Sequence, residues 1–281
     1  MRWLRPSEWL LVVYFGYAAV FSGELLPPGG FVLAGVAAAA VLSRAESQAC
    51  SRLLSVVRDW LPAPLVLVAY WAVDWFPRPA YSRNFEPSWI GLDRLLLHGW
   101  GAKAAIESLG PVLPSLLELC YSLLYAVTPV SIGILYLYRR RARVDRFLFT
   151  LLLGTLATYA LLPHFASQPP TVAFPGEDLP AVTTPFRLLN LWLLGHFDIR
   201  ISVFPSGHVT LGFSAAFAML LALPEKRRAG WILLVLACGV AVATVYGRYH
   251  YAVDGLAGLG VSLLAAAASY FVHSPLARRT G

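Results

Sequence analysis

The chain has few charged residues and few cysteines. Only 13% of its 281 residues are Asp, Glu, Lys or Arg, whereas about 25% is usual for a soluble domain. Its three cysteines show neither metal-ligand spacing nor the even number typical of a disulfide framework. The sequence also lacks a Walker loop, a dinucleotide-binding fingerprint, a long-period repeat and a low-complexity tract. These absences argue against a soluble nucleotide-dependent enzyme and against a disulfide-rich secreted domain.

Apolar residues, in contrast, make up 58% of the chain, and the mean hydropathy is +0.64. Several apolar runs reach the roughly 20 residues that a helix needs to cross a bilayer. We therefore predict an all-α fold, a polytopic transmembrane helical bundle with eight spans. The spans are expected near residues 8–24, 27–44, 61–77, 112–138, 146–163, 203–223, 230–247 and 252–272.

The net charge of +7 reflects basic residues in the short segments between apolar runs, which is the positive-inside pattern rather than a nucleic-acid site. With eight spans, all five basic segments fall on one side, so both termini are predicted to be cytoplasmic. These segments contain Arg2 and Arg5; Arg44, Arg52 and Arg58; Arg139, Arg140, Arg141, Arg143 and Arg146; Lys226, Arg227 and Arg228; and Arg278 and Arg279. The high content of Ala, Leu and Arg favours a bacterial inner membrane.

The opposite face is predicted to carry the segments 78–111 and 164–202, which are rich in Pro and Trp. Within the first of them, residues 89–110 have an amphipathic pattern that indicates a helix lying in the outer interface. The first two spans share no motif with the others. We therefore expect residues 1–60 to form an appended pair of spans with a cytoplasmic loop, and residues 61–281 to form a six-helix core.

Two short motifs concentrate polar chemistry at the edges of apolar runs. They are Phe204-Pro205-Ser206-Gly207-His208 and Gly247-Arg248-Tyr249-His250-Tyr251-Ala252-Val253-Asp254. Polar groups at membrane depth are costly and usually functional. The predicted topology places both motifs on the non-cytoplasmic face, although it was built without reference to them.

The spacing within the second motif suggests a nucleophile and the group that orients it. Asp254 follows His250 by one helical turn, so its carboxylate can hold one ring nitrogen and leave the other as a nucleophile or base. Arg248 supplies a fork of donors suited to phosphate oxygens. In the first motif, Ser206 and Gly207 offer backbone N–H groups at a helix N-terminus, although Ser206 could equally act only as a helix cap.

The two motifs together resemble the second and third motifs of the type 2 phosphatidic acid phosphatase (PAP2) superfamily. The stretch from Gly91-Leu92-Asp93-Arg94 through Glu118 to Tyr121 and Tyr125, with Gln168-Pro169-Pro170 later, is similar to its inositolphosphotransferase branch, which contains the inositol phosphorylceramide synthases. The resemblance covers about residues 85–265 and implies a PAP2-like six-helix catalytic core.

The resemblance implies that His250 attacks phosphorus to form a phosphohistidine, that Asp254 orients it, and that His208 protonates the leaving oxygen. It implies no metal and no organic cofactor. Two features depart from the phosphatase pattern: the Lys-to-Arg-Pro first motif is absent before Phe204, and Thr244 stands where the third-motif arginine is expected. Phosphate contacts are therefore expected from Arg248, with Arg187 or Arg200 as further candidates.

Glu118 and Asp93 are additional candidates for substrate binding. Glu118 lies inside an apolar span, where a carboxylate must be paired or protonated, so a structural hydrogen bond and a role in an acceptor pocket are both open. Asp93 could form an interfacial ion pair with Arg94.

We predict a membrane enzyme that moves a phosphate or phospho-headgroup from a lipid phosphate or phospholipid to a polyol, a lipid alcohol or water on the outer face. Plain lipid phosphate phosphatase activity is the alternative. A lipid transporter or scramblase is more distant, because no internal repeat is visible. The sequence does not determine the oligomeric state.

Overall fold

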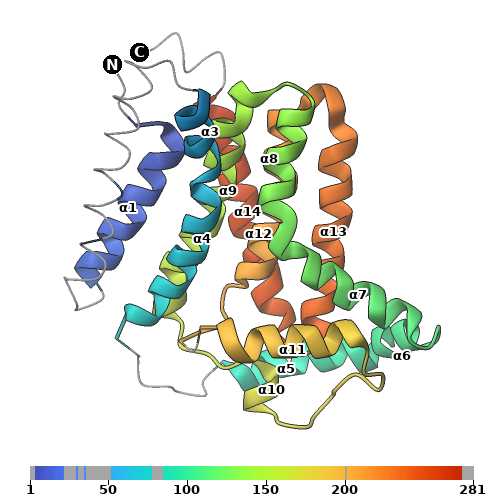
Figure 1. Ribbon diagram of the computed structural model, residues 1–281. Helices are drawn as coiled ribbons and strands as arrows, with labels where there is room; N and C mark the ends of the chain where they lie inside the picture. The colour runs from blue at the N-terminus through green and yellow to red at the C-terminus, as the bar shows by residue number, and fades with distance from the viewer. Residues whose placement is uncertain are drawn as a thin grey trace.

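The computed structural model describes residues 4–21, 30, 35, 52–77, 85–199 and 201–273, which form a helical bundle without a β-strand (Figure 1). Within these residues, five helices are long and apolar enough to cross a membrane. They are Leu53–Trp75, Val112–Leu137, Arg141–His164, Pro224–Tyr246 and Ala252–Val272. The predicted all-α polytopic bundle is thereby confirmed.

The elements of the bundle follow the chain in a simple order. They are α1 (Pro6–Phe21), α3 (Arg52–Trp60), α4 (Pro62–Trp71), α7 (Val112–Leu123), α8 (Val127–Leu137), α9 (Val144–Leu161), α12 (Gly207–Ala222), α13 (Arg227–Tyr246) and α14 (Ala252–Val272). Every predicted span except 27–44 coincides with one of these helices or with a consecutive pair of them. The span at 27–44 lies outside the described residues apart from positions 30 and 35.

One predicted boundary is wrong. The third span was expected to begin at residue 61, after a basic loop, but the helix starts at Leu53 because α3 runs almost directly into α4. The positive charge of Arg58 is typical of a segment between two spans, so the sequence predicts a loop there. In the structure its guanidinium is buried against α1, where Nη2 donates to Glu8 Oε2 at 2.7 Å, and this pairing lets a charged residue remain helical.

The short helix α12 forms the centre of the bundle and packs against α9, α13 and α14. Small residues allow this close packing. A side chain at Gly258 of α14 would lie 2.8 Å from the Ser206 carbonyl oxygen, and one at Gly154 of α9 would collide with Ser214. Because Gly258 has no side chain, the first turns of α12 and α14 can approach closely, and the two motifs meet there.

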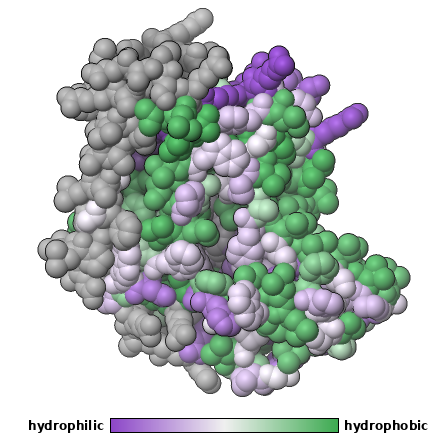
Figure 2. All heavy atoms as spheres, viewed as in Figure 1, coloured by the Kyte–Doolittle hydropathy of each residue, from purple (hydrophilic) through white to green (hydrophobic). Residues whose placement is uncertain are grey.

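Basic residues of these segments that the structure describes form ion pairs at one end of the bundle. Asp59 of α3 accepts hydrogen bonds from Arg5 at 2.6 Å and from Arg141 at 2.5 Å, and Arg143 pairs with Glu225 at 2.7 Å. Figure 2 shows hydrophilic side chains projecting at this end, near the α8–α9 and α12–α13 turns, above a largely hydrophobic helix surface.

Short helices lie across the opposite end (Figure 1). They are α5 (Glu86–Arg94), the π-helical turn η2 (Leu95–Gly99), α6 (Ala102–Glu107), α10 (Pro170–Ala173) and α11 (Pro185–Phe197). The amphipathic segment predicted at 89–110 thus forms helix, but it is broken after Gly99. Helix α11 was not predicted; it begins at Pro185, and the Thr184 hydroxyl caps it by accepting from the Arg187 N–H at 3.2 Å.

Candidate active site

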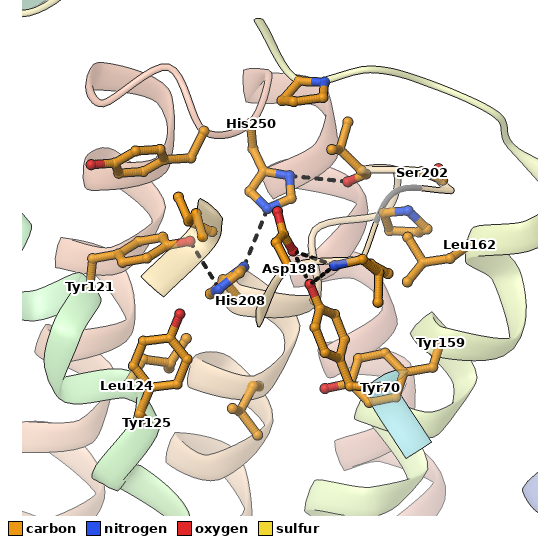
Figure 3. A pocket seen from close by; sticks show the side chains of 18 of the residues that line it. Tyr70, Tyr121, Leu124, Tyr125, Tyr159, Leu162, Asp198, Ser202, His208 and His250 are labelled. Atoms are coloured by element: carbon orange, nitrogen blue, oxygen red, sulfur yellow. Dashed lines mark hydrogen bonds between the residues drawn. The ribbon is translucent and has the colours of Figure 1, made fainter. Parts of the chain in front are cut away.

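The fold brings the two histidines of the motifs into direct contact. His208 lies in the first turn of α12, and His250 lies in the turn between α13 and α14. His250 Nε2 and His208 Nδ1 are 3.4 Å apart, and the ring centroids are 5.6 Å apart (Figure 3). Residues 42 positions apart in sequence therefore form one contacting pair.

The surroundings of His250 distinguish its two ring nitrogens. Nδ1 lies 3.1 Å from the Val203 carbonyl oxygen and 3.3 Å from Asp254 Oδ2. A carbonyl oxygen only accepts hydrogen bonds, so Nδ1 is a donor, and in the neutral ring the lone pair is on Nε2. Asp254 is itself held in place, because its Oδ2 also accepts from the Tyr251 N–H at 2.9 Å. The nucleophile and orienting group expected from the sequence are thus placed together.

His208 is held from its other side by Tyr121 of α7. The Tyr121 hydroxyl lies 2.9 Å from His208 Nε2, and the two rings stack with centroids 4.7 Å apart. A tyrosine hydroxyl can either donate or accept. It can therefore satisfy Nε2 in both protonation states of His208 and leave Nδ1 facing His250.

Ser206 connects the two motif-bearing helices. Its hydroxyl accepts from the Val209 N–H at 3.3 Å, which confirms the helix-capping interpretation. Its own N–H donates to the Asp254 carbonyl oxygen at 3.0 Å, so this group is not available as the anion donor that the sequence suggested. The N–H of Gly207 lies in the first helical turn and has no intrahelical acceptor.

Arg248 is completely buried and adopts a left-handed backbone conformation, with φ of 66°. Its Nη1 donates to Asp93 Oδ2 at 2.6 Å, and Asp93 Oδ1 accepts from the Ala252 N–H at 2.8 Å. Asp93 therefore pairs with Arg248 and not with its neighbour Arg94, which binds Asp178 at 3.1 Å. The Nε and Nη2 groups of Arg248 find no hydrogen-bond partner in the part of the chain that the structure describes.

Glu118 belongs to a second buried polar cluster, which we call the Glu118 cluster. It consists of Glu118, Arg187, Asn190 and Tyr249. Glu118 Oε1 accepts from Arg187 at 3.0 Å, and Oε2 accepts from Asn190 at 2.7 Å and from the Tyr249 hydroxyl at 2.8 Å. Arg187 also donates to the Gly247 carbonyl oxygen at 3.2 Å, so the cluster joins α7, α11 and the turn that carries His250.

A cavity of about 330 Å³ lies beside the histidine pair. Of the predicted site residues, Gly207, His208 and His250 line it, whereas Ser206, Arg248, Asp254, Glu118 and Asp93 do not. Its walls are mainly apolar and aromatic. They include Tyr70, Tyr121, Leu124, Tyr125, Tyr159, Leu162, Leu191, Leu194, Ile199 and Leu211.

The cavity also contains a carboxylate that sequence reasoning did not assign to the site. Asp198 follows α11 and lies next to the histidine pair in Figure 3, where the Tyr70 hydroxyl donates to it. Tyr70 and Tyr121 were likewise not predicted as site residues from the chemistry of the motifs. Arg200, a candidate phosphate ligand in the sequence, lies outside the described residues.

Comparison with known proteins gives the family. The profile of the PAP2 superfamily matches residues 89–268, which contain both motifs, the Glu118 cluster and Asp198. This chain belongs to the PAP2 superfamily. Membership indicates an enzyme of the phosphatase or phosphotransferase type, and the five apolar helices indicate that it is an integral membrane protein.

A PA-phosphatase-related-family protein from Dictyostelium discoideum is 40% identical over 60 residues. The match covers 21% of this chain and 10% of that protein, so it spans only a small part of either. No solved structure matches the chain.

Proposed function

We propose that this PAP2-superfamily protein transfers a phosphate or phospho-headgroup from a membrane lipid to an alcohol or to water, through a phosphohistidine at His250. The observation that supports this most is the orientation of His250, whose unprotonated Nε2 faces His208 at the edge of an apolar cavity. A nucleophile held by a third group, with an acid beside it, is the arrangement that covalent phosphoryl transfer requires.

The first half of the reaction transfers the phosphoryl group to the enzyme. His250 Nε2 forms a bond to phosphorus, the bond from phosphorus to the lipid oxygen breaks, and protonated His208 gives its Nδ1 proton to that oxygen. In the second half, the incoming hydroxyl loses its proton to His208 Nδ1 as its oxygen attacks phosphorus, and the electron pair of the P–N bond returns to His250. Asp254 stabilises the positive charge that develops on His250.

In this proposal the Gly207 N–H, which lies at a helix N-terminus in the cavity wall, stabilises the negative charge on the phosphoryl oxygens. Arg248 is buried and does not line the cavity, so it contributes its positive charge at longer range; its Nε and Nη2 donors have no partner among the described residues. In this proposal Asp93 orients Arg248 through its bond to Nη1. Glu118 would act indirectly, by fixing the turn that carries His250, because its carboxylate oxygens bind protein groups and do not line the cavity.

Transfer to an alcohol is favoured over plain hydrolysis by the similarity of residues 91–125 to the inositolphosphotransferase branch and by the apolar cavity. Plain phosphatase activity on phosphatidate or a polyprenyl phosphate is the alternative. The basic end of the bundle supports a cytoplasmic location for both termini, with the active site on the outer face of a bacterial inner membrane.

The test is to incubate purified protein with dioctanoyl phosphatidic acid, a polyprenyl phosphate or phosphatidylinositol, each labelled with ³²P, and to quench in alkali, in which phosphohistidine survives. Wild type should carry label that peptide mapping assigns to His250. His208→Ala should slow labelling, and His250→Ala should abolish it. Unchanged labelling of His250→Ala, or donor consumption without any labelled wild-type enzyme, would refute the mechanism.

A further inference from the structure

Asp198 is a carboxylate beside the reactive histidines that the proposed mechanism does not use. It is partly buried and lines the cavity together with His208 and His250. Both of its hydrogen bonds within the described residues fall on one oxygen, Oδ1. The donors are the Ile199 N–H at 3.1 Å and the Tyr70 hydroxyl. Oδ2 therefore retains its capacity to accept.

The charge of Asp198 limits what the cavity can hold. A carboxylate repels phosphate oxygens, so this side of the histidine pair is unfavourable for the phosphoryl group, whereas the Gly207 N–H in the cavity wall offers a donor to it. A carboxylate oxygen without a donor favours a ligand with hydroxyl or amine hydrogens. The remaining walls are apolar or aromatic and fit the carbon skeleton of such a ligand.

The direction of the pKa shift of Asp198 agrees with a site from which water is partly excluded. Burial raises the pKa of its carboxyl above the usual range, while the Tyr70 hydroxyl and the nearby His250 act in the opposite direction. Tyr70 in turn fixes the carboxylate rotamer, because its ring belongs to the cavity wall and its hydroxyl binds Oδ1.

We infer that Asp198 and Tyr70 form a hydroxyl-binding subsite, and that the phosphoryl acceptor is a neutral molecule with at least two hydroxyl groups. This inference rests on the proposed function. One hydroxyl attacks phosphorus on His250 and gives its proton to His208 Nδ1, so the same hydrogen cannot also bind Asp198. A second hydroxyl of the acceptor donates to Asp198 Oδ2 and positions the first.

The proposal is tested by partition between acceptors. Wild-type protein in detergent micelles receives dioctanoyl phosphatidic acid and one of four acceptors at equal concentration: 1-octanol, 1,2-octanediol, glycerol or myo-inositol. Mass spectrometry then measures the ratio of phosphorylated acceptor to inorganic phosphate. Because a hydrogen bond to a charged group is lost with the mono-ol, we expect the ratio for 1,2-octanediol to exceed that for 1-octanol about tenfold.

Variants assign this preference to Asp198. Asp198→Leu should reduce the diol-to-mono-ol preference to about one, whereas Asp198→Asn, which keeps an acceptor oxygen, should retain part of it. Glu225→Gln is the control for removal of a carboxylate, because Glu225 is exposed at the opposite end of the bundle and does not line the cavity, and it should show the wild-type preference. Comparison of octanediol with glycerol and inositol shows whether the acceptor comes from the membrane or from water.

The outcomes separate the inference from the proposed function. Equal ratios for 1-octanol and 1,2-octanediol, or inorganic phosphate as the sole product with phosphohistidine still formed, would overturn the acceptor subsite and leave the phosphohistidine mechanism intact. Absence of both phosphohistidine and donor consumption would overturn both. The wild-type comparison alone is decisive if Asp198→Leu fails to fold.

Discussion

The histidine site and the Glu118 cluster are both buried polar groups at the same end of the bundle, yet they differ in how completely they are satisfied. In the Glu118 cluster, both carboxylate oxygens bind protein donors, and the guanidinium of Arg187 binds a carboxylate and a carbonyl. At the histidine site, His250 Nε2 faces another ring nitrogen, and two donors of Arg248 and one carboxylate oxygen of Asp198 have no hydrogen-bond partner among the described residues.

The number of unsatisfied polar groups distinguishes a cluster that stabilises the fold from a site that can bind a ligand. Burying polar groups is tolerated when they satisfy one another, and such a network rigidifies the fold. Groups left unsatisfied beside a cavity are costly unless a ligand completes them. The comparison predicts that mutations in the Glu118 cluster reduce stability, whereas mutations at the histidine site reduce turnover.

The largest effect is expected for His250→Ala. Removal of the nucleophile should reduce turnover at least about a thousandfold, because members of a catalytic unit cannot be replaced by binding alone. The melting temperature in detergent should change less than in Glu118→Ala, since the Asp254 carboxylate keeps its hydrogen bond from the Tyr251 N–H at 2.9 Å. Substantial turnover would show that a different group attacks phosphorus.

Glu118→Ala should instead destabilise the protein by about 3 to 5 kcal/mol, because Arg187 would remain buried without its carboxylate. Denaturant unfolding in detergent measures this change, and turnover is normalised to the folded fraction. Glu118→Gln is the matched variant that keeps the shape of the side chain and one acceptor oxygen, and its effect on stability should be smaller. A stable Glu118→Gln protein without turnover would show that Glu118 acts on the substrate and not only on stability.

Tyr121→Phe should lower kcat about tenfold and move the pH dependence of kcat, because His208 Nε2 would lose the hydroxyl that serves both protonation states. A purely structural role would lower stability without moving the pH profile. Tyr159→Phe is a suitable control, since Tyr159 lines the same cavity but is not hydrogen-bonded to His208. The same change in the pH dependence of kcat in both variants would contradict a direct effect of the Tyr121 hydroxyl on His208.

The smallest effect concerns pH. Since burial raises the pKa of Asp198, its carboxylate should become protonated at a higher pH than an exposed Asp, whose pKa is about 3.9. The preference for a diol acceptor should therefore fall as the pH drops through this raised pKa. The free energy of unfolding should respond in the opposite direction. Because the pKa of Asp198 is higher in the folded than in the unfolded state, Asp198 stabilises the fold at low pH, and this stabilisation is lost as the pH rises through the raised pKa. Asp198→Asn should flatten the acceptor preference over the same pH range.

Much of the architecture was predictable from local patterns. Hydropathy located the helices, and basic residues placed the connecting segments at one end. The error at residues 52–60 arose because Arg58 looks like a loop residue in sequence, whereas its pairing with Glu8 on a distant helix allows it to be helical. Helix α11 was missed because its outward apolar residues, such as Leu188 and Trp192, have no local marker that distinguishes them from a loop near the membrane.

The sequence by itself determined the membrane bundle and the common end at which the two motifs lie, because hydropathy, basic segments and one-turn spacing are local properties of the chain. His208, His250 and Asp254 could be placed on one face from these properties alone. Only the tertiary structure decided which polar groups complete the site. Tyr121 lies 87 positions from His208, and Tyr70 lies 128 positions from Asp198. Such contacts depend on how whole helices pack, and the close approach of α12 and α14 at Gly258 sets the geometry of the site.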